Sequence, residues 1–114
     1  MKHVADRLAE GQRVTFRPTG NSMRPLINSK DEVVVAPLSD GAVLEVGDIV
    51  LVRVSGSIYL HLVDAVDRDR ERVRIANNRG RVNGWAPFRQ VYGICVEVDG
   101  VARAKAAAKA AEAT

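Results

Sequence analysis

Cysteine and aromatic residues are both scarce in this sequence of 114 residues. The single cysteine, Cys95, excludes an intrachain disulfide and a multi-cysteine zinc site. Its neighbours in 91–98 are mostly apolar, so we expect a buried structural thiol rather than a nucleophile. Aromatic residues make up 4% of the chain, which leaves no stacking platform for nucleic acid.

The chain also has no apolar run long enough to cross a bilayer, and its first residues lack the apolar core of a secretory signal. We therefore expect a cytoplasmic protein without a membrane span. The net charge of +3 permits weak attraction to anionic partners without identifying one. Charges of alternating sign in 67–72 indicate a solvated turn, and no helix-turn-helix unit is present, so a nucleic-acid partner is not expected.

Valine, spread in short runs between turn residues, favours a mainly β fold with one small domain. A short helix is expected over residues 2–10, ended by Gly11. The expected strands cover residues 13–17, 32–36, 48–54, 58–66, 72–76 and 91–98, with a hairpin turn at 55–57 and one helical turn at 87–90.

Three parts of the chain follow from this pattern. Residues 1–11 form the N-terminal helix, residues 12–100 form the folded domain, and residues 101–114 form an Ala/Lys-rich tail. Because the tail has high helix propensity but no apolar stripe beyond alanine, we expect a frayed helix or a disordered extension.

One loop places a serine where chemistry is possible. Ser22 follows a predicted strand and stands between Gly20, which permits a tight turn, and Pro25, which stiffens the chain after it. Backbone N–H groups in such a turn can face a developing oxyanion. Taken alone, the serine is simply a turn residue, so the order of the later motifs decides its interpretation.

This loop is the first of several motifs that follow one another along the chain. They are Gly20-Asn-Ser-Met-Arg-Pro25, Gly47-Asp48, His61 on a returning hairpin strand, Asn77-Asn78, Gly84-Trp-Ala-Pro87 and Val91-Tyr-Gly93. This order resembles the superfamily of type I signal peptidases and LexA-like self-cleaving repressors, over about residues 14–98. The resemblance implies that the chain has their β-barrel-like catalytic domain without a DNA-binding half. It also implies a bacterial or phage-encoded member of the superfamily.

The resemblance also implies roles for two side chains. Ser22 matches the nucleophile. His61 stands where most members carry a lysine base, and in this respect the chain is similar to the members whose base is histidine. Neutral imidazole can accept the serine proton near neutral pH. The amides of Gly20 and Ser22 are the expected oxyanion hole. Without the resemblance, His61 would be interpreted as a polar position on a half-exposed strand.

A third residue usually orients the histidine, and here the match is incomplete. Members with a base histidine generally place an aspartate in the segment that corresponds to 75–85, which contains no carboxylate. Asn77, Asn78 or Asn83 could orient the ring by hydrogen bonding. We expect Asp64 to point away from His61 on a regular strand. The sequence therefore favours a Ser-His dyad, with weak activity or none as open alternatives.

Other side chains receive non-catalytic interpretations. Lys30 lies in a predicted turn and is expected to be solvated, His3 is expected to be exposed, and Trp85 and Phe88 are expected to anchor the core or a loop. Neither a cofactor nor a metal site is expected.

Two functions remain. The first is a serine endopeptidase that cuts peptide or protein substrates after small residues, with self-processing at 102–104 or 104–106 of the tail. The second is an inactive member of the same fold that binds an extended peptide at a sheet edge. Nucleic-acid binding ranks last.

Overall fold

Strand β3 (Ile49–Val54) runs through the middle of the sheet and is buried on both faces. In the computed structural model, which describes residues 1–111, Ile49 and Leu51 pack into one apolar cluster while Val50 and Val52 pack into another. A strand that is covered on both faces needs apolar residues at every position, which accounts for the uninterrupted run Ile-Val-Leu-Val.

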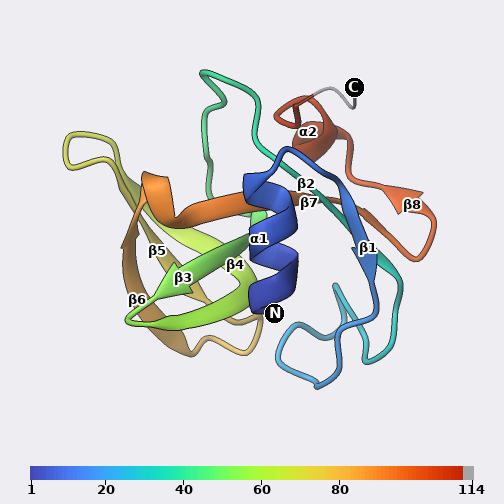
Figure 1. Ribbon diagram of the computed structural model, residues 1–114. Coiled ribbons are helices and arrows are strands. Elements are labelled where there is room, and N and C mark those ends of the chain that lie inside the picture. The colour runs from blue at the N-terminus through green and yellow to red at the C-terminus, as the bar shows by residue number, and fades with distance from the viewer. Residues whose placement is uncertain (112–114) are drawn as a thin grey trace.

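The sheet is antiparallel and contains eight strands in the order β1-β2-β7-β3-β4-β5-β6, with β8 paired to β7 (Figure 1). Their bounds are β1 Val14–Phe16, β2 Val33–Ala36, β3 Ile49–Val54, β4 Ser57–Asp67, β5 Arg72–Ala76, β6 Val82–Pro87, β7 Val91–Val98 and β8 Val101–Ala102. The mainly β prediction is confirmed, and each predicted strand is present to within one residue at either end. Strands β6 and β8 were not predicted.

The hairpin between β3 and β4 sets the position of His61. Val54 pairs with Ser57, so only Ser55 and Gly56 form the turn, and both have positive φ angles of 48° and 87°. Two consecutive residues in this region fit the tight turn that matches the twist of a hairpin. The register that follows places His61 opposite Val50 at the centre of the sheet.

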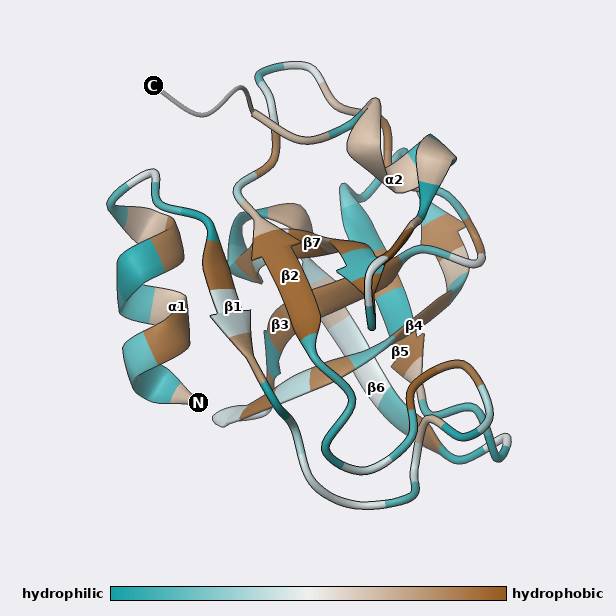
Figure 2. Ribbon diagram, turned by 90° about the vertical axis from the view of Figure 1, so that its right-hand side faces the viewer, coloured by the Kyte–Doolittle hydropathy of each residue, from teal (hydrophilic) through white to brown (hydrophobic). Residues whose placement is uncertain are grey.

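Two helices cover opposite faces of this sheet, as Figure 2 shows for α1 and α2 on either side of β2 and β7. Helix α1 (Lys2–Ala9) buries Val4, Ala5 and Leu8. It approaches β7 at Gly93, where a Cβ would lie 2.6 Å from the Ala36 carbonyl oxygen and 3.1 Å from a Leu8 methyl group. The short 3-10 helix η1 (Phe88–Gln90) precedes β7 at the predicted turn.

The tail is helical in part, as one of the two expected alternatives required, but it packs on the body and is not a frayed extension. Strand β8 and helix α2 (Ala104–Ala107) both pack on the body, and Ala106 is buried in the core. The chain then runs beside 37–39, where the Ser39 N–H donates to the Lys109 carbonyl at 2.9 Å. Residues 112–114 of the predicted tail lie outside the described residues.

Lys109 secures the tail through a buried ion pair. Its Nζ lies 2.9 and 2.8 Å from the two carboxylate oxygens of Asp48, and 2.8 Å from Glu45 Oε1. The side chains of Lys109 and Asp48 are 11% and 8% exposed, whereas that of Glu45 is 60% exposed. A sequence pattern of alanines and lysines does not reveal this pair, because its stabilising partner lies 61 residues away. No helix in residues 1–111 has the length and apolar character to cross a membrane.

Lys109→Met should lower the free energy of unfolding by about 3 kcal/mol, because it leaves the Asp48 carboxylate buried and unpaired. Glu45→Gln is the matched control and should cost much less stability, since its side chain is exposed to solvent. Chemical denaturation of the two variants measures the difference. Equal losses would contradict a structural role for the buried pair.

Candidate active site

The loop that carries Ser22 is anchored by two apolar side chains. Met23 and Ile27 are 5% and 4% exposed and pack in the cluster that also holds Leu60 of β4. Gly20 has a φ of 106°, a backbone conformation that residues with a Cβ rarely adopt. The apolar anchors thus fix the loop against the strand that bears His61, and Ser22 is left half-buried at its surface.

A second loop holds the serine from the other side. The Asn78 N–H donates to the Ser22 carbonyl at 2.9 Å, and Asn78 Nδ2 donates to the Arg24 carbonyl at 2.8 Å. Arg79 Nε donates to the Asn21 carbonyl at 3.3 Å. Three hydrogen bonds to carbonyls on both sides of the serine therefore limit how far its backbone can move.

Ser22 and His61 are brought together by this arrangement. Ser22 Oγ lies 3.2 Å from His61 Nε2, across 39 positions of sequence. His61 is 9% exposed, and its ring stacks on Tyr59 with centroids 5.0 Å apart and 22° between the planes. A hydroxyl and an imidazole at this separation meet the geometric requirement for a nucleophile and its base.

Asn83 of β6 contacts the other ring nitrogen. Its Oδ1 lies 2.7 Å from His61 Nδ1, and because an amide oxygen only accepts hydrogen bonds, Nδ1 carries the proton. The Nε2 nitrogen then holds a lone pair directed at the Ser22 hydroxyl. This is the tautomer that a general base requires.

The other two candidate asparagines do not contact the imidazole. Asn77 Oδ1 accepts the N–H groups of Arg79 and Arg81, and thus shapes the turn before β6. Asn78 binds the serine loop, as described above. Of the three asparagines that the sequence left open, only Asn83 lies in hydrogen-bond contact with His61.

The pKa of His61 is lowered from its ordinary value of 6.5, because burial disfavours the charged ring. The hydrogen bond to Asn83 acts in the opposite direction and supports the imidazolium. Burial dominates, so His61 is neutral at pH 7 and able to accept a proton.

No carboxylate balances this histidine among residues 1–111. Asp64 forms hydrogen bonds of 2.8 and 3.2 Å with Arg74, and Asp48 is held by Lys109. The pairing of β4 with β5 shifts register at Asp64, so the strand is not regular there, and the Asp64 carboxylate binds Arg74 rather than His61.

The expected oxyanion hole is only partly free. The Gly20 N–H already donates to Ser29 Oγ at 3.3 Å, a long hydrogen bond within the loop. Within the described chain, no hydrogen bond from the Ser22 N–H is found. The Ser22 amide is therefore the donor that stands ready for a substrate oxygen, whereas the Gly20 amide would have to exchange its partner.

A small cavity of about 190 Å³ opens beside the dyad. Its walls are mostly apolar and include both catalytic candidates, and they are formed by Met1, Pro18, Thr19, Gly20, Ser22, Met23, Ile27, Asn28, Tyr59, Leu60 and His61. A site of this size beside Ser22 has room for a short side chain.

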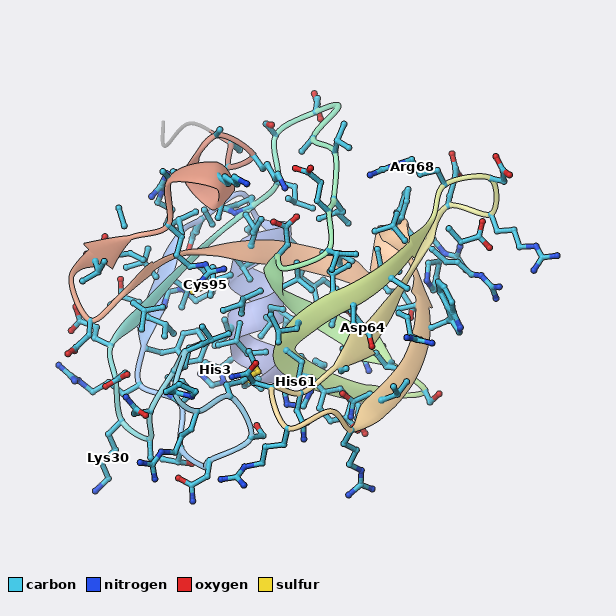
Figure 3. The ribbon with its side chains drawn as sticks, turned by 180° about the vertical axis from the view of Figure 1, so that it is seen from behind. His3, Lys30, His61, Asp64, Arg68 and Cys95 are labelled. Atoms are coloured by element: carbon cyan, nitrogen blue, oxygen red, sulfur yellow. The ribbon has the colours of Figure 1, made fainter. Side chains whose placement is uncertain are left out.

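The remaining candidates lie away from the dyad. Cys95 is buried, and burial raises the pKa of its thiol to about 11, as a structural cysteine requires. Lys30 is exposed on an outer loop, far from His61 in Figure 3. Trp85 is 38% exposed, so it is not part of the core, and it lies under Arg72 at 4.4 Å.

In the part of the chain that the structure describes, no three His, Cys, Asp or Glu side chains gather as metal ligands would.

Comparisons with protein-family models, with curated proteins and with solved structures found no match to this chain.

The two histidines of the chain allow the His61 environment to be tested by an NMR titration. His61 should titrate below 6.5, because its burial favours the neutral ring. Asn83→Ala should lower the pKa further, since it removes a bond that supports the imidazolium, and Asn83→Asp should raise it above the wild-type value. The His3→Gln variant assigns the signals. A wild-type His61 pKa above 6.5 would exclude the proposed environment.

Proposed function

We propose that this chain is a serine endopeptidase in which Ser22 is the nucleophile, His61 the general base and Asn83 the residue that orients the base. The observation that carries the proposal is the continuous hydrogen-bonded series from Ser22 Oγ through His61 to Asn83, at 3.2 and 2.7 Å. The signal-peptidase/LexA-like fold and a cytoplasmic location belong to the same proposal, supported by the motif order and the single cysteine.

The geometry suits a two-stage acyl transfer. Ser22 Oγ attacks the scissile carbonyl carbon while His61 Nε2 takes the hydroxyl proton, and the Ser22 N–H faces the oxygen that becomes negative. The imidazolium then gives its proton to the leaving amine as the peptide bond breaks. A water molecule repeats the sequence on the acyl-serine and restores the free hydroxyl.

The cavity beside the dyad has room for the side chain that precedes the cleaved bond. At about 190 Å³, with Tyr59 and Ile27 in its wall, it accepts an alanine-sized side chain with little rearrangement. We propose cleavage after small residues on the ground of the resemblance to signal peptidases, which cut after such residues.

A peptide-binding module without chemistry is the second candidate, and one observation favours it. Asn83 is neutral, and Asp64 and Asp48 are paired with other cations, so no carboxylate among residues 1–111 balances the charge of a protonated His61. Strand β6, which carries Asn83, lies at one end of the sheet order and could pair with an extended peptide.

A fluorophosphonate probe distinguishes the two candidates. Ser22 should be labelled, Ser22→Ala should not be, and His61→Gln should slow labelling at least a hundredfold because the general base is lost. The rate should rise with pH along the titration of His61, with a midpoint below 6.5. Intact-mass spectrometry follows the reaction, with Ser57→Ala as control at an exposed serine that begins β4. Equal labelling of wild type and His61→Gln would favour the binding module.

Trimming of the chain's own tail supplies a second test. Cleavage after Ala104 or Ala106 requires an extended segment, but both residues lie in α2 and Ala106 is 3% exposed. Lys109→Met should therefore accelerate trimming at least tenfold by releasing the tail, and the double variant with Ser22→Ala should stay intact. Intact mass over time at high protein concentration measures both. Identical masses in Lys109→Met and the double variant would contradict self-processing.

A further inference from the structure

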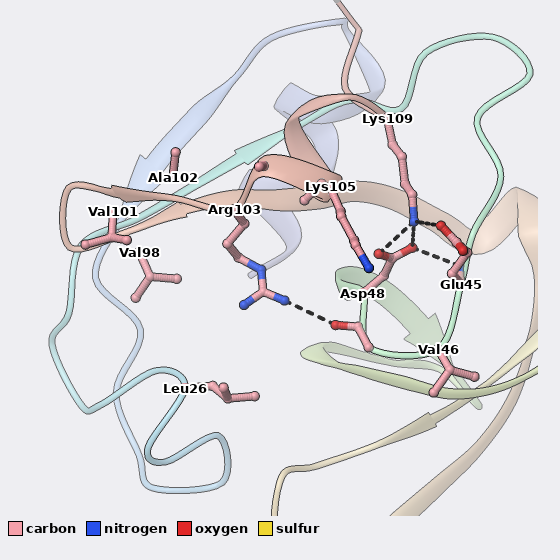
Figure 4. A pocket seen from close by; sticks show the side chains of 13 residues that line it. Leu26, Glu45, Val46, Asp48, Val98, Val101, Ala102, Arg103, Lys105 and Lys109 are labelled. Atoms are coloured by element: carbon pink, nitrogen blue, oxygen red, sulfur yellow. Dashed lines mark hydrogen bonds and ion pairs between the residues drawn. The ribbon is translucent and has the colours of Figure 1, made fainter.

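A second cavity of the described chain lies away from the Ser22–His61 dyad. It has a volume of about 690 Å³ and separates the segment after β7 from the loop before β3 (Figure 4). Arg103, Lys105 and Lys109 enter it from the tail, and Glu45 and Asp48 enter it from the loop. Leu26 of the serine loop forms part of its rim.

Two of these cations lack an anionic partner. Lys109 is neutralised by Asp48 and Glu45, but neither Arg103 nor Lys105 forms an ion pair in residues 1–111. Figure 4 shows both side chains extending from the tail segment into the same space. The cavity therefore holds positive charge that the described chain does not balance, which favours an anionic ligand.

The guanidinium of Arg103 is incompletely satisfied. Its Nη2 donates to the Gly47 carbonyl at 3.2 Å, while Nε is the one buried side-chain nitrogen or oxygen without a partner among the described residues. Buried polar groups of folded proteins are almost always hydrogen-bonded, so such an exception requires an explanation. A carboxylate seated against the guanidinium supplies the missing acceptor after a small rotation of the side chain.

The rim beside Arg103 is apolar and open. Leu26, Val46 and Val101 are 41%, 66% and 69% exposed, and they lie with Val98 around the guanidinium. An apolar group next to the carboxylate would cover this rim. Because the rim is exposed, most of a long alkyl chain bound there would remain in water. The end of a peptide, by contrast, needs to bury only one side chain against the rim.

We propose that this cavity binds the C-terminal residue of a peptide, with its carboxylate on Arg103 and Lys105 and an aliphatic side chain on Leu26, Val46 and Val101. The site does not depend on peptidase activity. Binding would place the peptide against the loop that carries Ser22, since Leu26 lies four residues after the serine.

A labelled peptide ending in leucine tests the site in the Ser22→Ala chain, where cleavage cannot consume the probe. The fluorescein-labelled peptide with a free carboxylate should bind at least tenfold more tightly than its C-terminal amide, because the ion-paired hydrogen bonds need the negative charge. Fluorescence anisotropy measures both affinities. Equal affinity of the acid and the amide would overturn the proposal.

Matched variants locate the binding. Lys105→Gln should weaken binding of the peptide acid two- to fivefold. Val101→Asp, at an exposed position, should weaken the same binding at least tenfold, because the new carboxylate repels that of the peptide. Lys2→Gln, an equal charge change on α1, should have no effect. Loss of binding in Lys2→Gln as large as in Lys105→Gln, or tighter binding of decanoate than of the peptide, would overturn the assignment.

Discussion

The burial of strand β3 on both faces is the constraint on which the rest of the structure depends. One face holds α1 and the two apolar anchors of the serine loop, and the other holds the valines of β4 and β5 together with Ala106 of α2. Because β3 also pairs with β4, the same strand fixes the position of His61 beside Ser22. The packed core, rather than the conformation of one loop, therefore brings Ser22 and His61 together.

Electrostatics define what this dyad can do. Burial keeps His61 neutral, and Asn83 selects the tautomer that leaves Nε2 free to accept the serine proton. A carboxylate in place of Asn83 would also stabilise the imidazolium that forms during reaction, which a neutral amide does only weakly. The arrangement is thus prepared for proton acceptance but supports the charged intermediate less than an aspartate would.

Much of the fold could be predicted from the sequence, because alternating or continuous valine-rich runs specify strands directly. Strand β6 could not be predicted in this way, because Asn83, Gly84 and Pro87 interrupt its apolar pattern, and its pairing with β5 depends on tertiary structure. For the same reason three asparagines were equivalent in sequence, although only Asn83 stands on β6 opposite the imidazole. The packing of the tail on the body could not be predicted, because Asp48, which binds Lys109, lies 61 residues away in sequence.

The protonation of the His61 ring tests the central claim most directly. In a chain with ¹⁵N-labelled histidine at pH 8, the account predicts a protonated Nδ1 and an unprotonated Nε2, with the Nε2 shift changed by Ser22→Ala because its hydrogen bond is lost. A proton on Nε2 would contradict the role of His61 as the base that activates the serine. An Nε2 chemical shift that does not change in Ser22→Ala would contradict it too.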